Sequence, residues 1–172
     1  MAGKKNPLVK LTTSYGPIEI ELFRDKAPIT VKNFMGYVKR GHYNGMIFHR
    51  VIKGFMIQGG GFNPGMKQVA SAGTIRNEAD SGIKNLTGTI AMARTADPHS
   101  AGAQFFINTN NNTNLDYRSK TQLGWGYAVF GKVVNGMKTV RRIEAARTHR
   151  SGYFGDVPIK DIAIIKVTIL RK

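Results

Sequence analysis

Short strand-like segments separated by turn residues run through most of the chain, and this pattern restricts the fold more than any other feature. Within Leu8–Phe23 the stretch IEIEL alternates apolar and acidic residues, the period of two expected for a half-buried strand. Because Tyr15–Pro17 supplies a turn, Leu8–Phe23 predicts a β-hairpin. Further strands are expected from segments rich in β-branched or aromatic residues: Met46–Ile52, Phe55–Gln58, Thr87–Arg94, Ala103–Thr109, Tyr127–Val134 and Asp161–Leu170.

Two other segments have helical periodicity. In APITVKNFMGYVKRG (27–41) the proline suits a first helical turn, the apolar residues share one face, and the last glycine is a natural stop. In NGMKTVRRIEAA (135–146) apolar residues recur every three positions. Short strands with such turns predict a β-barrel or sandwich, and two isolated helices would close the open ends of a barrel. No repeat or linker marks a second domain, so residues 1–172 predict one domain with a short N-terminal extension at 1–7.

The chain has no cysteine, which excludes disulfides, thiolate nucleophiles and zinc-thiolate sites. No apolar run approaches the roughly 18 residues that span a bilayer. The start, MAGKKNP, lacks the apolar core of a signal peptide. We therefore expect a soluble protein without a membrane association, cytoplasmic as written, or periplasmic if a leader before Ala2 has been removed.

The formal net charge of +16 could attract nucleic acid, acidic partners or anionic membrane surfaces. The basic residues are spread along the chain, with some crowding over 138–150 and no compact run of five or more. A basic solvated surface with nonspecific polyanion binding is the interpretation that this spread favours over specific nucleic-acid recognition.

Familiar catalytic patterns are not evident. There is no Gly-x-Ser-x-Gly elbow, the four histidines lack metal-ligand spacing, and the ten carboxylates are scattered, so we expect no metal site and no cofactor. The glycine-rich stretch at 59–73 lacks the Gly-Lys-Ser/Thr ending of a phosphate loop. An ordered surface loop that spans Gly61–Asn85 is therefore favoured over a phosphate-binding loop. His49 lies within a strand pattern, where a structural histidine is favoured over a metal ligand or a general base.

The segment FHRVIKGFMIQGG (Phe48–Gly60) places an arginine and a glutamine in a largely apolar strand pattern. Strict alternation puts Arg50, Ile52, Met56 and Gln58 on one face. Phe55 has the opposite parity unless a bulge or turn at the Lys-Gly step resets the register. Burying a guanidinium without partners is costly. Two interpretations therefore stay open: Arg50 pairs with a buried carboxylate, or it points into a site.

Long motifs resemble those of the cyclophilins, which are peptidyl-prolyl cis-trans isomerases. They are FHRVIKGFMIQGG, GTIAMARTADPHSAGAQFFIN (Gly88–Asn108) and GYAVFGKVVNGM (Gly126–Met137), and APITVKNF resembles the first family helix. The similarity covers roughly residues 8–170, and IQGGGFNPGMKQ and LGWGYAVFGKV resemble the bacterial branch. The resemblance implies a mainly β fold, an eight-stranded antiparallel closed β-barrel capped by two α-helices.

The resemblance also implies site residues. The catalytic residues would be Arg50, Gln58 and Phe55. The substrate-binding residues would be Met56, Phe106 and Leu115 in an apolar proline pocket with Phe55, Gln104 in the groove, Ala93, Arg94 and Thr95 along the substrate backbone, and Tyr127 at the pocket edge.

This residue set suits rotation about an Xaa–Pro bond, whose barrier comes from partial double-bond character. Because no bond is broken, neither nucleophile nor metal is needed. An apolar pocket would hold the proline ring. A guanidinium that hydrogen-bonds the proline nitrogen would stabilise the twisted state more than the planar one.

The sequence departs from the family pattern at the pocket. Asn114 stands where many cyclophilins have tryptophan, so only weak cyclosporin binding is expected. Trp125 does not align with that position and is interpreted as a packing residue. Arg94 replaces an asparagine of many relatives; it could favour acidic substrates, or only its backbone matters.

Two hypotheses about function remain. The first is a monomeric isomerase that acts on proline-containing peptides and on unfolded or flexible protein segments. The second is a module that binds proline-containing segments or polyanions, with incidental isomerase activity. The set formed by Arg50, Phe55, Gln58 and Phe106 favours the enzyme, and only the net charge favours the module.

Overall fold

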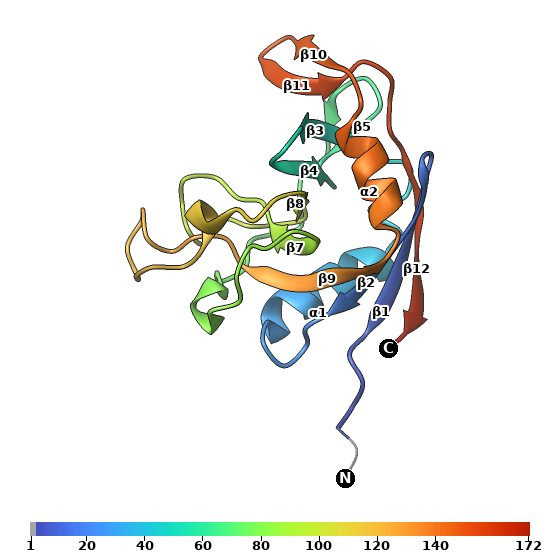
Figure 1. Ribbon diagram of the computed structural model, residues 1–172. Coiled ribbons are helices and arrows are strands. Elements are labelled where there is room, and N and C mark those ends of the chain that lie inside the picture. Colours follow the sequence, from blue (N-terminus) through green and yellow to red (C-terminus); the bar gives the residue numbers. More distant parts are fainter. Residues whose placement is uncertain (1–2) are drawn as a thin grey trace.

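The computed structural model describes residues 3–172. Eight antiparallel strands form one strongly curled sheet in the order β12-β1-β2-β9-β7-β8-β4-β3, and two helices accompany it (Figure 1). The sheet strands are β1 (Leu8–Thr13), β2 (Gly16–Leu22), β3 (Phe48–Ile52), β4 (Met56–Gly59), β7 (Thr89–Met92), β8 (Phe105–Asn108), β9 (Val129–Asn135) and β12 (Ile164–Arg171). The helices are α1 (Pro28–Lys39) and α2 (Met137–Glu144).

The two edge strands of the sheet meet without forming a ladder. A single bridge joins Ile47 to Ala163, and the backbone N–H of Phe48 donates to the carbonyl of Ile162 at 2.9 Å. The N–H of Val167, further along β12, donates to the side chain of Asn44 instead of to a strand. The expected eight antiparallel strands and two helices are therefore confirmed, but the barrel is a curled half-barrel whose seam is held by isolated contacts.

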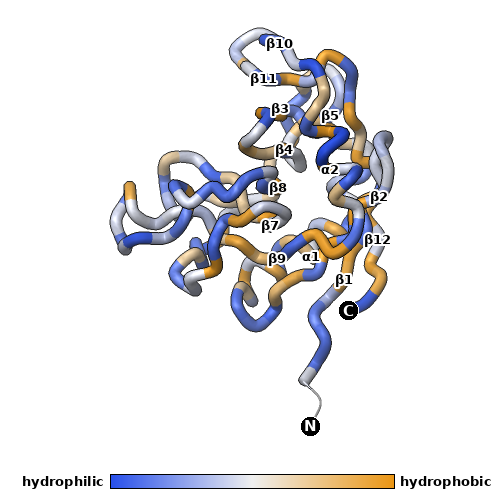
Figure 2. Tube along the Cα trace, in the orientation of Figure 1, coloured by the Kyte–Doolittle hydropathy of each residue, from blue (hydrophilic) through white to orange (hydrophobic). Residues whose placement is uncertain are grey.

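Strand alternation divides the apolar residues between two sides of the sheet. Phe105 and Ile107 of β8 point into the main core, where α1 inserts Phe34 against the rings of Tyr43, Phe105 and Phe130. Helix α2 packs against β2, β3 and β4. Figure 2 shows hydrophobic stretches along the strands and α1, and hydrophilic ones along the N-terminal segment. The intervening Phe106 faces the other side, where it joins a second, smaller apolar cluster.

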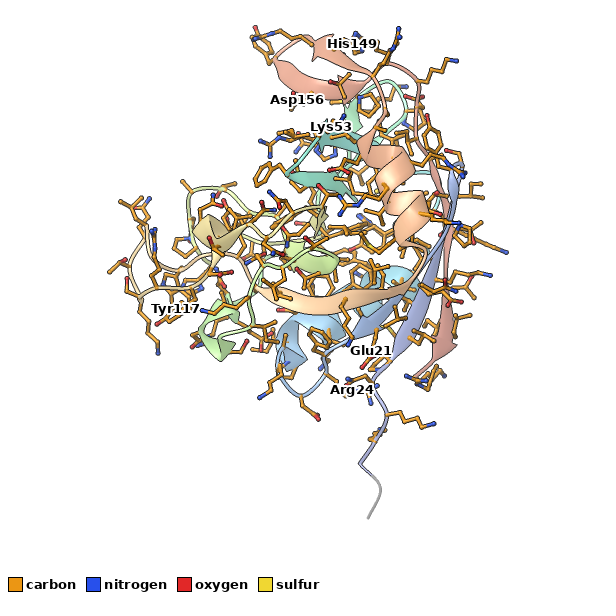
Figure 3. All side chains as sticks on the ribbon, viewed as in Figure 1. Glu21, Arg24, Lys53, Tyr117, His149 and Asp156 are labelled. Carbon is orange, nitrogen blue, oxygen red and sulfur yellow. The ribbon has the colours of Figure 1, made fainter. Side chains whose placement is uncertain are left out.

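A hairpin outside the main sheet was not anticipated from the sequence. It comprises β10 (Thr148–Ser151) and β11 (Phe154–Pro158), and β11 packs against β3. Gly152 takes the left-handed φ of 59° that its two-residue turn requires. Figure 3 labels His149 and Asp156 on this hairpin, above Lys53 of the β3–β4 turn. The hairpin therefore extends the molecule beyond β3.

The connection between β4 and β7 is mostly irregular, as expected for Gly61–Asn85. It contains a two-stranded sheet of β5 (Phe62–Asn63) and β6 (Lys67–Gln68), and the short helix η1 (Ala79–Ser81). Another short helix, η2 (Thr113–Leu115), lies between β8 and β9. None of the helices within residues 3–172 has the length and apolar character that crossing a membrane would require.

Candidate functional site

One hollow of about 220 Å³ opens on the outer side of β4 and β8, and we call it the outer-face hollow. Nine of the eleven site residues expected from the sequence line it: Arg50, Phe55, Met56, Gln58, Ala93, Arg94, Phe106, Leu115 and Tyr127. The other two, Thr95 and Gln104, line a neighbouring hollow that shares Gln58, Ala93 and Arg94 with the first. The structure thus brings all the expected residues to one region of the surface.

Register explains how strands distant in sequence supply these side chains. In the β3–β4–β8 ladder Arg50 pairs with Gln58, and Gln58 pairs with Phe106. Paired residues share a sheet face, so all three point outward. Phe55 lies in the turn before β4, after Gly54 with its φ of 74°. The turn lets Phe55 join the outward face despite its opposite parity.

Arg50 is exposed at the rim of the outer-face hollow. Its Nη1 donates a hydrogen bond of 3.3 Å to the Oε1 of Gln58, whose Nε2 donates to the Oε1 of Gln104 at 3.1 Å. Within residues 3–172 the guanidinium makes no ion pair. Pairing of Arg50 with a buried carboxylate is therefore wrong, because β3 carries the side chain to the solvent side of the sheet. The remaining N–H groups can bind a ligand.

Buried asparagines hold the backbone of the apolar wall. The Nδ2 of Asn112 donates to the carbonyl of Phe55 and to the Oδ1 of Asn108, both at 2.8 Å. The Nδ2 of Asn85 donates to the carbonyls of Leu115 and Tyr127, at 3.2 and 3.3 Å. Three wall residues are thus fixed by one network, which the sequence analysis missed. The sequence feature that could have indicated this network was the run of asparagines next to the FFIN strand. Polar residues at that position are equally typical of an exposed loop.

Helix α2 fixes the turn that carries Phe55. The Oε2 of Glu144 accepts a hydrogen bond of 2.8 Å from the N–H of Gly54, and its Oε1 accepts one of 3.0 Å from Arg141. Burial alone would raise the pKa of the Glu144 carboxyl, but hydrogen bonds and the charge of Arg141 lower it overall. Glu144 therefore remains an anionic anchor for the β3–β4 turn.

Arg94 makes the hydrogen bonds of its guanidinium within the protein. Its Nε and Nη2 donate to the carbonyl of Gly126, its Nη1 donates to the carbonyl of Thr95, and its guanidinium lies 4.4 Å from the ring centroid of Tyr127. The side chain thus clamps the edge of the hollow, a use that neither sequence interpretation of Arg94 anticipated.

Asn114 and Trp125, the two positions considered in connection with the family tryptophan, differ in burial. Trp125 is buried, and its ring packs against His99 and Tyr117 with centroids 4.7 and 5.7 Å away. Its interpretation as a packing residue is confirmed. Asn114 is exposed.

His49 is buried against Phe62, with ring centroids 4.3 Å apart. Burial, with a smaller contribution from the charge of Arg50, lowers its pKa to about 4. It is neutral at neutral pH, which fits the structural histidine expected from the sequence.

The structure combines an antiparallel half-barrel with an arginine and two glutamines beside an apolar outer hollow, and the comparisons identify the class of protein to which this arrangement belongs. The model of the family "Cyclophilin type peptidyl-prolyl cis-trans isomerase/CLD" matches residues 8–169. The chain belongs to the cyclophilin family, and it is a peptidyl-prolyl cis-trans isomerase.

Individual relatives support the bacterial branch that the motifs indicated. Peptidyl-prolyl cis-trans isomerase B of Escherichia coli is 55% identical over 162 residues, which are 94% of this chain and 99% of the relative. Isomerase cyp18 of Streptomyces antibioticus is 53% identical over 94% of this chain and 98% of its own. A crystal structure of a Cryptosporidium parvum cyclophilin in the presence of the dipeptide Ala-Pro superposes with a TM-score of 0.81, at 30% identity, over 96% of this chain and 99% of that one.

Proposed function

We propose that the outer-face hollow is the active site and that it acts on proline-containing peptides and on unfolded or flexible protein segments. One observation carries the proposal: Arg50 stands exposed at the rim of an apolar hollow beside Gln58, and within residues 3–172 most of its N–H groups have no protein partner. A relative was crystallised in the presence of Ala-Pro, which supports a proline ligand.

In this proposal the apolar residues hold the proline ring while the acyl side of the bond turns. Met56 and Phe106 form the buried floor, and Phe55 and Leu115 form the partly exposed wall. Rotation localises the lone pair on the proline nitrogen, and Arg50 donates a hydrogen bond to it. Since this bond strengthens only as the amide twists, it lowers the barrier. Gln58 holds the guanidinium in position through its Oε1.

The segment Ala93–Thr95 would bind the substrate backbone. Gln104, whose side-chain amide is hydrogen-bonded to that of Gln58, would lie beside the bound peptide. Ala93 and Arg94 border both the outer-face hollow and the neighbouring one, which supports a peptide running between them. Tyr127, whose ring lies 5.7 Å from that of Phe106, would close the edge.

We further propose that residues 1–172 form a monomeric single domain that needs no cofactor and works in the cytoplasm or the periplasm. The exposed Asn114 in place of an indole supports weak cyclosporin binding, and the charge of +16 supports salt-sensitive, nonspecific binding of polyanions.

An isomerisation assay on a proline tetrapeptide tests the active site. We expect Arg50→Ala to lower kcat/KM by about 100-fold or more, the cost typical of removing one preorganised donor. The matched control is Arg147→Ala, which removes an equal charge from an exposed residue that does not line the outer-face hollow. An equal loss of kcat/KM in both variants would show that the positive charge, and not the position of Arg50, matters.

A further inference from the structure

A third hollow, of about 300 Å³, adjoins the outer-face hollow at Arg50. Its lining includes Arg50 and Gln58, which both hollows share, together with His49, Phe62 and Phe154. We call it the aromatic hollow. Its outer wall comes from the β10–β11 hairpin, which lies beyond β3 in Figure 1.

We propose that the aromatic hollow is a subsite for an uncharged aromatic side chain of the substrate, one or two residues after the proline. The proposal rests on the active site proposed above, because the two hollows would hold neighbouring parts of one peptide.

Three aromatic rings give the aromatic hollow its chemistry. The ring of Phe62 lies 4.3 Å from His49 and 5.2 Å from Phe154, the latter edge to face at 74°. Phe154 remains 41% exposed, so it keeps a free surface for a further ring. His49 is neutral at neutral pH because burial lowers its pKa to about 4. Arg50 is then the one charge in the lining, which disfavours a basic side chain.

The direction of the peptide follows from the residues that the hollows share. Ala93 and Arg94 border the outer-face hollow and the neighbouring hollow, but not the aromatic hollow, whereas Arg50 borders the outer-face and aromatic hollows, but not the neighbouring one. Gln58, Gln68 and Gln104 line both the neighbouring and the aromatic hollows, so the three hollows meet around this group of glutamines. We therefore place the substrate residues before proline along Ala93 and Arg94, and those after proline beside Arg50. Arg50 can reach the nitrogen and the carbonyl of one proline, and the chain beyond that carbonyl leaves beside Arg50. Since adjacent Cα atoms are about 3.8 Å apart, the next two residues can reach the aromatic hollow.

The test measures isomerisation by NMR exchange, without a coupled protease, on four peptides. Each peptide has one proline in a sequence that is otherwise alanine. In three of them phenylalanine replaces the alanine directly after proline, the second alanine after proline, or the alanine directly before proline. The fourth, the all-alanine peptide, has alanine at every position except the proline. We expect wild type to favour one of the two peptides with phenylalanine after proline, by about threefold to tenfold in kcat/KM, the range of an added aromatic pair.

Phe154→Ala is expected to abolish this preference and to leave the rate on the all-alanine peptide unchanged, which also shows that the variant folds. Tyr153→Ala is the matched control, since Tyr153 belongs to the same hairpin, is 97% exposed and does not line the hollow. It should keep the preference.

Three results would overturn the subsite: no preference in wild type, a preference only for phenylalanine before proline, or an equal loss on all peptides in Phe154→Ala. Failure of wild type to isomerise any peptide, or an unaltered rate in Arg50→Ala, would instead contradict the active site itself. The two proposals can therefore fail separately.

Discussion

Replacing Asn112 by alanine tests whether buried polar groups position the apolar wall of the outer-face hollow. Asn112 is buried, and its Nδ2 bonds the carbonyl of Phe55 and the Oδ1 of Asn108. The carbonyl of Phe55 keeps its second bond, from the N–H of Thr109 at 3.0 Å. The Oδ1 of Asn108, a fully buried residue, loses its Asn112 partner.

The expected cost follows from these contacts. Two hydrogen bonds contribute about 0.5–1.5 kcal/mol each, and a buried acceptor without a partner adds about 1–3 kcal/mol. We expect Asn112→Ala to lower the free energy of unfolding by about 3 kcal/mol. With an unfolding entropy of about 2.1 cal/mol/K per residue, that corresponds to a Tm lower by about 8 °C. The loosened Phe55 should also weaken peptide binding, so that KM rises more than kcat falls.

Thermal unfolding followed by circular dichroism, together with kinetics below the transition, measures both effects. Asn114→Ala is the matched control, because this exposed asparagine is two residues away. We expect it to change Tm by less than about 2 °C, as surface substitutions usually do. An Asn112→Ala variant that melts with the control and keeps its KM would refute the positioning role.

Three further predictions concern single residues near the site. Between pH 7 and pH 4 the His49 side chain binds a proton more readily in the unfolded state than in the folded state, where its pKa is about 4. Acidification over this range should therefore lower the free energy of unfolding by about 3 kcal/mol. Urea unfolding of His49→Gln at several pH values should show a pH dependence that is smaller by that amount. Gly126→Ala should cost about 2 kcal/mol or more, since its φ is 68° and a Cβ would lie 2.6 Å from the carbonyl oxygen of Leu115, and thermal unfolding will measure this loss. Arg94→Ala should leave unchanged the ratio of isomerisation rates for peptides with glutamate or alanine before proline, because the guanidinium is bound to the protein and stacked on Tyr127; a fall in the ratio would show that it contacts substrate.

The sequence was informative where periodicity alone decides the structure. Alternation, β-branched and aromatic content and helical spacing located the eight sheet strands and both helices. Alternation also placed Arg50, Met56 and Gln58 on one face, as the ladder confirms. Alternation could not place Phe55, because its position depends on the φ of Gly54 and on the anchor that α2 provides.

Features that depend on partners distant in the chain were missed. The β10–β11 hairpin has a polar first strand, Thr148–Ser151, that lacks apolar alternation. It becomes a strand pair through its Gly-Tyr turn and its packing against β3. The asparagine network is satisfied only when residues near 85, 108 and 112 meet. The seam of the half-barrel likewise depends on the contact of Ile47 with Ala163, which local pattern does not encode.

The central claim is that Arg50 stabilises the twisted peptide bond and not merely the bound peptide. A titration with one proline peptide gives its Kd, and NMR exchange at the saturating end of that titration gives the isomerisation rate in the bound state. For Arg50→Ala the account predicts a bound-state rate lower by about 100-fold or more with Kd altered by less than about threefold. A weakened Kd with an unchanged bound-state rate would contradict it.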